Sequence, residues 1–149
     1  MIEVYLQGPS LLREAVAGMN HEQLLARPVP GKMSTLEVVA HLSDFEPILA
    51  DRMKRIIALD RPALLGADEN LFMANLAYDQ RVLEEELRLI EVTRSQMARI
   101  LSTLPASAWA RVGVHSVRGE MSLEQMLNGA ISHINHHLPF IAEKRRLIG

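Results

Sequence analysis

Two stretches with the same helix-start pattern constrain most of what this chain can fold into. In Ser34-Thr35-Leu36-Glu37 and in Ser122-Leu123-Glu124-Gln125, a serine is followed three positions later by Glu or Gln. The hydroxyl and the later side chain satisfy the first free backbone amides of a helix, so this spacing is a capping box. We therefore predict one long helix from Thr35 to about Leu59 and a last helix that begins after Ser122.

Apolar residues at three- and four-residue spacings predict two further helices. The first covers residues 9–26, with Pro9 in its first turn and with an end or a break near Asn20, after which residues 22–25 could form a short separate turn. The other covers about residues 75–104 and ends before Pro105. Residues 59–73 have no clear period and indicate a crossover connection. The loop over residues 105–121 is rich in turns and allows short extended pairing. We expect residues 1–149 to form a single all-α domain, a four-helix bundle with a long crossover between the second and third helices.

Composition excludes several classes of protein. Apolar residues make up 48% of the chain and charged residues 23%, which is typical of a soluble helical domain. There is no cysteine, so any metal site must use histidines and carboxylates. A net charge of −2 lacks the basic footprint that nucleic acid binding needs. No apolar run approaches the roughly 18 residues of a membrane span, and no leader pattern opens the chain. We expect a cytoplasmic protein with neither nucleic acid nor membrane as a partner.

The densest chemistry lies in His133-Ile134-Asn135-His136-His137, which holds three of the six histidines. At about 100° per residue, His133 and His137 share the apolar face of the last helix, whereas His136 lies roughly 120° from its centre. Histidines four residues apart lie on successive turns and can share one metal ion. The alternative is two buried histidines that bond to neighbouring helices, which is at least as common for this spacing alone.

A third histidine strengthens the metal hypothesis. His41 lies at the inward edge of the apolar stripe of the helix predicted from Thr35, so it is the candidate third ligand. Asp44, one turn later, could orient an imidazole by accepting its free N–H, or could pair with a basic residue. Arg52 could line a pocket or extend to solvent. His115 is a reserve candidate for the site.

Together these segments resemble the DinB/YfiT-like superfamily over nearly the whole chain. The resemblance rests on residues 31–46, on Arg111-Val112-Gly113-Val114-His115 with Gly119, and on residues 133–137. That family is a four-helix bundle whose central divalent metal is held by one histidine on the second helix and a His-x-x-x-His pair on the last. Those motif positions match His41, His133 and His137. The aromatic residue that often precedes the family's second helix is Met33 here, which removes no ligand.

The resemblance implies a metal-dependent enzyme, because members with an assigned activity include transferases that act with low-molecular-weight thiols. We expect a small-molecule substrate, a small thiol as co-substrate and a zinc or nickel ion, since neutral imidazoles suit borderline ions. A metal-dependent hydrolase with the same ligands is one alternative, and a non-catalytic, stress-related metal-binding or dimerising module is another. A fourth protein ligand such as His136 or His115 would favour the non-catalytic role. No Ser-His-Asp or paired-carboxylate pattern names a catalytic residue.

Two further expectations concern assembly and pH. Val39 and Ile57 both fall roughly 160° from His41 around the helix, outside the main apolar stripe. They predict an outer face for a homodimer, or residues that pack under the crossover. An ordinary histidine titrates near pH 6.5, so metal affinity is expected to fall steeply below that pH.

Overall fold

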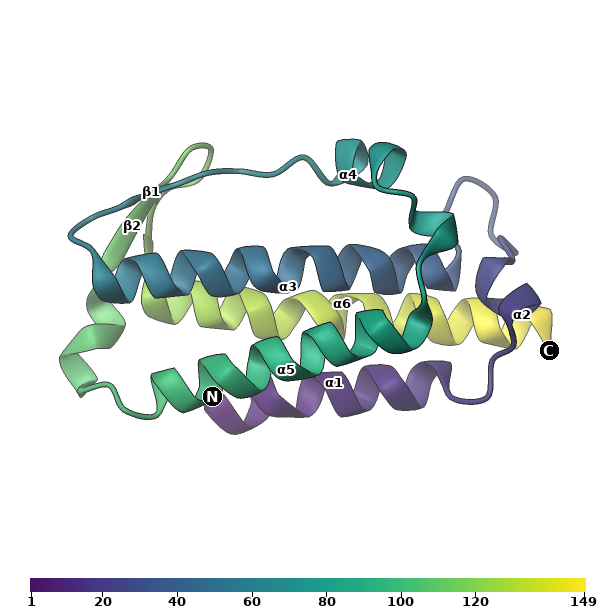
Figure 1. Ribbon diagram of the computed structural model, residues 1–149, viewed down its shortest axis with the longest axis horizontal. Coiled ribbons are helices and arrows are strands. Elements are labelled where there is room, and N and C mark those ends of the chain that lie inside the picture. Colours follow the sequence, from purple (N-terminus) through teal and green to yellow (C-terminus); the bar gives the residue numbers. More distant parts are fainter.

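Four long helices lie side by side along the molecule (Figure 1). The computed structural model describes all residues 1–149. The long helices are α1 (Ile2–Val16), α3 (Thr35–Ala58), α5 (Leu83–Leu101) and α6 (Leu123–Ile148). Helices α1 and α3 each pack against both α5 and α6, so the order around the bundle is α1, α5, α3, α6. The predicted four-helix bundle and its long crossover are confirmed.

Both predicted capping boxes are present. The Ser34 hydroxyl accepts a bond of 3.1 Å from the Glu37 amide, and the Glu37 carboxylate accepts one of 2.9 Å from the Ser34 amide. Ser122 and Gln125 make the same reciprocal pair at the start of α6. The two helices that carry the candidate histidines therefore begin where local sequence predicted.

The chain returns along the length of the bundle between α3 and α5, because these two helices run in the same direction (Figure 1). This crossover holds β1 (Ala63–Leu64), α4 (Glu69–Asn75) and η1 (Tyr78–Gln80). The prediction of one helix from residue 75 was wrong, since α5 begins only at Leu83. Ala77 has a left-handed backbone with φ 52°, which no right-handed helix continues through.

The first helix also differs from its prediction over residues 9–26. It starts at Ile2 and ends at Val16, and a separate short helix, α2 (His21–Leu25), follows. Pro9 lies inside α1 and lacks the N–H that would bond the Tyr5 carbonyl four residues earlier. The Arg94 side chain donates to that carbonyl at 2.7 Å, so the helix continues through the proline. Asn20 then opens α2 with its own capping box.

A small sheet closes one end of the bundle. Strands β2 (Val112–His115) and β3 (Gly119–Ser122) form an antiparallel hairpin after the short helix η2 (Ala106–Ala110). Strand β1 of the crossover pairs with β2 in parallel, with Leu64 opposite His115. The hairpin agrees with the extended pairing expected within residues 105–121, whereas β1 was not expected. The sheet ties the crossover to the end of the bundle where α6 begins.

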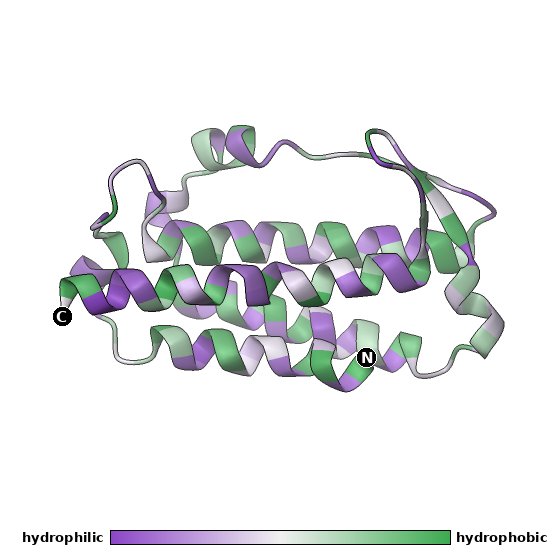
Figure 2. Ribbon diagram, turned by 180° about the vertical axis from the view of Figure 1, so that it is seen from behind, coloured by the Kyte–Doolittle hydropathy of each residue, from purple (hydrophilic) through white to green (hydrophobic).

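Apolar residues recur among polar ones along the long helices (Figure 2), and the buried apolar residues of these helices form the core. Val39 is fully buried in this core, and Ile57 is partly buried against it. They therefore form no exposed outer face, and the homodimer prediction loses the observation on which it rested.

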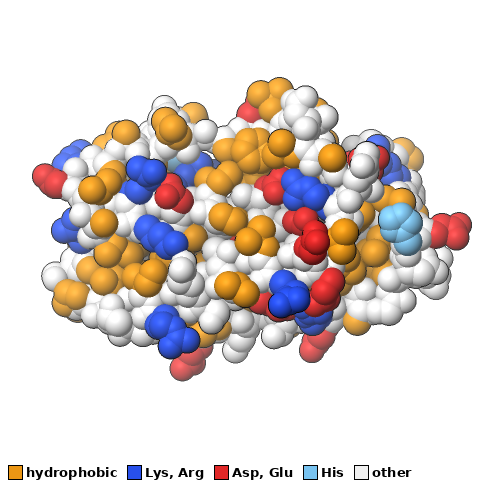
Figure 3. Space-filling view, in the orientation of Figure 1, with side chains coloured by type: hydrophobic (Ala, Val, Ile, Leu, Met, Phe, Trp, Pro, Cys, Tyr) orange, Lys and Arg blue, Asp and Glu red, His pale blue; other side chains and the backbone are white.

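On the face shown in Figure 3, Lys and Arg side chains lie among Asp and Glu side chains. Several of them pair across helices, as Arg13 of α1 does with Glu84 of α5 at 2.8 Å. No helix combines the length and the apolar run needed to cross a membrane.

A fully buried arginine lies where the four long helices meet. Arg94 of α5 pairs with Glu46 of α3 at 2.6 Å and donates to the carbonyls of Tyr5 on α1 and Ala130 on α6 at 2.7 Å each. A Cβ atom on Gly8 would lie 2.5 Å from the Arg94 guanidinium, so glycine leaves the room that this side chain needs. One side chain thus links all four helices.

We expect Arg94→Met to lower the free energy of unfolding by about 3–5 kcal/mol, because it leaves the Glu46 carboxylate buried without a partner. The double variant Arg94→Met/Glu46→Met should recover more than half of that loss. Urea unfolding followed by circular dichroism measures both. The control is Arg13→Met, which removes two solvent-exposed ion pairs, with Glu84 and Glu91. This control variant should cost less than about 1 kcal/mol. A single variant as stable as the wild type would contradict the role given to Arg94.

Candidate metal centre

Helices α3 and α6 bring three histidines together. His41 comes from α3, and His133 and His137 come from successive turns of α6. Each offers one ring nitrogen, and these nitrogens all lie within 4.8 Å of one another. The Nε2 atoms of His41 and His133 are only 2.9 Å apart. The structure thus groups the same three residues that helical phase selected.

The surroundings keep these imidazoles neutral. Burial lowers the pKa of His133 to about 3 and that of His137 to about 4, and the nearby His41 adds to both shifts. Burial also lowers the pKa of His41, although Glu69 and Asp44 oppose it. The buried Arg94 cation contributes to the low pKa of His133. A neutral imidazole has a free nitrogen lone pair, so the group can bind a cation at neutral pH.

Aromatic rings and one carboxylate complete the surroundings of His41. Phe45, one turn along α3, has its ring centre 5.0 Å from that of His41 and 5.3 Å from that of Phe72 on α4. Glu69, the first residue of α4, places a carboxylate oxygen 3.8 Å from His41 Nε2. About two thirds of the Glu69 side chain is exposed, so this carboxylate is in contact with solvent.

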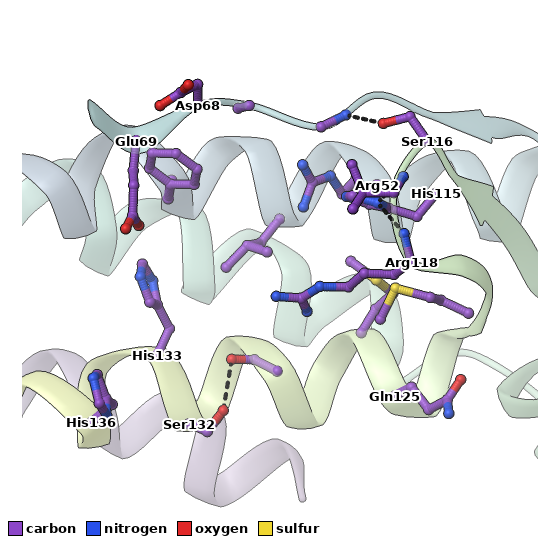
Figure 4. Close-up of a pocket in the computed structure, with 18 residues that line it drawn as sticks. Arg52, Asp68, Glu69, His115, Ser116, Arg118, Gln125, Ser132, His133 and His136 are labelled. Carbon is purple, nitrogen blue, oxygen red and sulfur yellow. Dashed lines mark hydrogen bonds between the residues drawn. The ribbon is translucent and has the colours of Figure 1, made fainter. Parts of the chain in front are cut away.

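His133 of the histidine group lines an open cavity of about 900 Å³ between α3, the crossover, the hairpin and α6. His133, His136 and Glu69 line one end of this cavity, and Arg52, His115 and Arg118 line the other (Figure 4). A cavity of this size accommodates a small organic molecule.

The other candidate residues have distinct places. Asp44 makes a bidentate ion pair with Arg81, with N–O distances of 2.9 and 2.8 Å. Of the two roles considered for Asp44, it therefore pairs with a basic residue and does not orient an imidazole. His136 is exposed and lines the cavity, outside the three-histidine group. His115 is buried at the end of β2, and Arg52 lines the cavity instead of extending freely to solvent.

Comparison with known proteins agrees with this architecture. The sequence profile of the DinB superfamily matches residues 5–141. The chain belongs to the DinB superfamily. A relative from Bacillus licheniformis, whose name reads "Putative metal-dependent hydrolase", is 30% identical over 146 residues, which cover 96% of this chain and 82% of the relative.

Two solved structures share the fold of this DinB-superfamily chain. YfiT from Bacillus subtilis, described as a probable metal-dependent hydrolase with an unusual four-helix bundle topology, superposes with a TM-score of 0.92 at 26% identity. The match covers 99% of this chain and 85% of YfiT. The mycothiol-dependent maleylpyruvate isomerase superposes with a TM-score of 0.71 at 11% identity over 93% of this chain and 57% of the isomerase. At that identity the second likeness concerns the fold alone.

Sequence reasoning did not single out Glu69. It lies in a connection without a helical period, and only the crossover's path along the bundle brings it to His41. The sequence did hold a weak signal, because Asp is a favoured helix N-cap residue. In the structure, Asp68 accepts bonds from the amides of Asn70 and Leu71 in that role. That cap predicts a short helix at Glu69 but not what the helix faces.

We expect the metal-free protein to lose stability as the pH falls from 6.5 toward 4. In this window the unfolded chain takes up protons on histidines that stay neutral when folded, so the free energy of unfolding decreases. Each such histidine contributes at most about 1.4 kcal/mol per pH unit. Urea unfolding at pH 7 and pH 5 measures the effect.

The variant His133→Leu should show a smaller difference between the two pH values, whereas Ser132→Ala, an exposed neighbour that does not titrate, should keep the wild-type difference. An unchanged pH dependence in His133→Leu would show that His133 is not buried neutral. Because the pKa values of His133 and His137 are lowered in the folded chain, protons should compete with a metal ion for these nitrogens at a lower pH than the 6.5 expected from an ordinary histidine.

Proposed function

We propose that this protein is a metal-dependent hydrolase of small molecules, with one divalent ion held by His41, His133 and His137. The observation that carries the proposal is a group of three neutral imidazoles at the edge of an open cavity. The hydrolase names of the relatives at 26–30% identity support the reaction class.

The donor set fits such an ion. A tetrahedral centre with nitrogens at about 2.1 Å needs them about 3.4 Å apart. The 2.9 Å between Nε2 of His41 and Nε2 of His133, and the 4.8 Å within which all three nitrogens lie, bracket that spacing. The buried Nδ1 of His133 has no partner in the protein, and its Nε2 lies 2.9 Å from Nε2 of His41, so the ring makes no hydrogen bond to a residue outside the three-histidine group. Three imidazoles favour zinc or nickel over magnesium or calcium.

The residues of this chain then have separate tasks. A bound divalent ion supplies Lewis acidity, which lowers the pKa of water and polarises a substrate carbonyl. Glu69, at 3.8 Å from His41, can accept a proton on its carboxylate and pass it to the leaving group. Phe45 packs against His41 and restricts water on that side, and Phe72 packs against Phe45. The cavity provides room for the substrate beside His133.

A transferase that uses a small thiol would employ the same three ligands, and sequence reasoning placed it first. The order is reversed here, because the hydrolase names come from relatives that match nearly the whole chain, whereas the thiol-dependent isomerase shares only the fold. A non-catalytic metal module is less favoured, since neither His136 nor His115 joins the group as a fourth ligand.

We expect purified wild type to bind one zinc or nickel ion per chain, and His41→Ala, His133→Ala and His137→Ala each to bind less than a tenth of that amount. Metal analysis after dialysis measures the stoichiometry. The matched control is His136→Ala on the same helix, which should keep one ion. Equal metal content in His133→Ala and His136→Ala would overturn the ligand assignment.

Circular dichroism after chelation separates a catalytic ion from a structural one. The core of Leu, Ile, Val and Met does not include the three histidines. Helicity should therefore persist at neutral pH and 25 °C, with a lower melting temperature. Collapse of helicity on chelation would show that the ion holds the fold together, which contradicts the proposed function.

Glu69→Gln tests the proton acceptor. The amide keeps the shape of the side chain but cannot take a proton, so we expect metal content to stay at one ion while hydrolysis slows at least a hundredfold. Rates are measured on a panel of activated esters and amides with zinc-loaded protein. Asp68→Asn is the control, because the Asp68 carboxylate is the neighbouring acid but is held by the amides of Asn70 and Leu71 as the cap of α4. A Glu69→Gln enzyme with the wild-type rate would remove Glu69 from the reaction.

A further inference from the structure

Two arginines at the far end of the cavity have no carboxylate partner. Arg52 donates one bond, from Nη2 to the Leu65 carbonyl at 2.8 Å, and its Nε is buried without any hydrogen-bond partner. Arg118, on the hairpin turn, makes no side-chain bond or ion pair, and its guanidinium lines the same cavity. An unpaired buried donor of a charged group is costly, so a ligand that accepts from Arg52 Nε is expected, and the exposed Arg118 beside the same cavity can donate to that ligand as well.

The acidic residues nearby are already engaged. Asp51 precedes Arg52 on α3, but its carboxylate bonds to Arg55 at 2.7 Å. Glu120 lies on β3, and its carboxylate bonds to Arg61 at 3.0 Å. Asp68 at the other end of the cavity is held by amides of α4. No protein carboxylate is therefore left to neutralise Arg52 and Arg118.

The two cations also act on each other and on a neutral donor. Burial lowers the pKa of Arg52, and the charge of Arg118 lowers it further. His115 accepts bonds on Nδ1 from the amides of Val117 and Arg118 at 3.0 and 3.1 Å, so its hydrogen is on Nε2. Burial and the two arginines lower the pKa of His115, which keeps it a neutral donor. The far end of the cavity thus holds donors and no acceptor of opposite charge.

We propose that Arg52 and Arg118 bind an anionic oxygen group of the substrate, a carboxylate or a phosphate, while the bond to be cleaved lies at the three histidines. Both ends belong to one cavity, so a single small molecule can reach both (Figure 4). Guanidinium groups bind carboxylates and phosphates through paired, charge-assisted hydrogen bonds. The substrate class is therefore an anionic ester or amide, an inference that rests on the proposed function for the reactive end.

A set of probes that differ only in terminal charge tests this. Adipic monohydroxamate presents a metal-binding hydroxamate at one end and a carboxylate at the other; its primary-amide analogue is neutral, and the matching phosphonate tests the second oxyanion. For zinc-loaded wild type we expect the carboxylate or the phosphonate to bind at least tenfold more tightly than the amide, measured by calorimetry. Whichever oxyanion binds more tightly identifies the group.

Arg52→Gln and Arg118→Gln should each reduce that preference to less than threefold and keep one metal ion per chain. The control is Arg61→Gln, at the same end of the protein but paired with Glu120, which should keep the full preference. A wild type without charge preference, or a preference that survives in both Gln variants, would overturn the proposal.

A second titration measures anion binding at Arg52 and Arg118 in the absence of metal. Adipate and adipamide are added to chelator-treated full-length protein and followed by amide NMR. Adipate alone should shift the resonances of residues 115–118 in wild type, and Arg118→Gln should abolish the shift. No such shift in wild type would contradict the anion site. This result stands even if the histidines bind no metal, so the two proposals fail separately.

Discussion

The bundle depends on the buried contact that Arg94 makes with Glu46. This pair, with the carbonyls of Tyr5 and Ala130, joins all four long helices at one level along the bundle. Burial raises the pKa of Glu46, and Arg94 counteracts that shift, so each residue makes the burial of the other tolerable. A buried ion pair of this kind contributes little net stability compared with apolar residues, but it penalises any register in which the partners separate. We interpret Arg94 as fixing how the helices slide and rotate against one another.

The same contact positions the histidines. Glu46 lies five residues after His41 on α3, and Ala130 lies three residues before His133 on α6, so the contact holds the two histidine-bearing helices together within about one and a half turns of the site. The positive charge of Arg94 also contributes to the low pKa of His133. A structural ion pair therefore supports two properties that metal binding needs, close imidazoles and neutral ones. Mutations at Arg94 would affect the site without touching it.

The sequence correctly predicted those features that depend on neighbouring residues along the chain. Two capping boxes located the starts of α3 and α6, and helical phase selected His41, His133 and His137, because both depend on residues within one or two turns. The wrong start of α5 has a local cause, the left-handed backbone at Ala77, but three other misses are long-range. Pro9 was read as a helix start because the donor that replaces its missing N–H comes from Arg94, far away in sequence. Val39 was placed on an outer face because a helical wheel does not show the neighbouring helices that bury it. Glu69 depends on where the crossover passes.

That path follows from topology. Since α3 and α5 run in the same direction, the chain between them must travel the length of the bundle, and it passes over the face where α3 and α6 bring the histidines together. Pairing of β1 with β2 fixes one end of the crossover to the hairpin that carries His115 and Arg118. At the other end, α4 holds Glu69 beside His41 and packs Phe72 against Phe45. A bundle with a short α3–α5 turn would leave this face bare. The parallel pair of helices thus creates the cavity, and the two attachments of the crossover give its ends opposite chemistry, imidazoles with a carboxylate at one and unpaired guanidinium groups at the other.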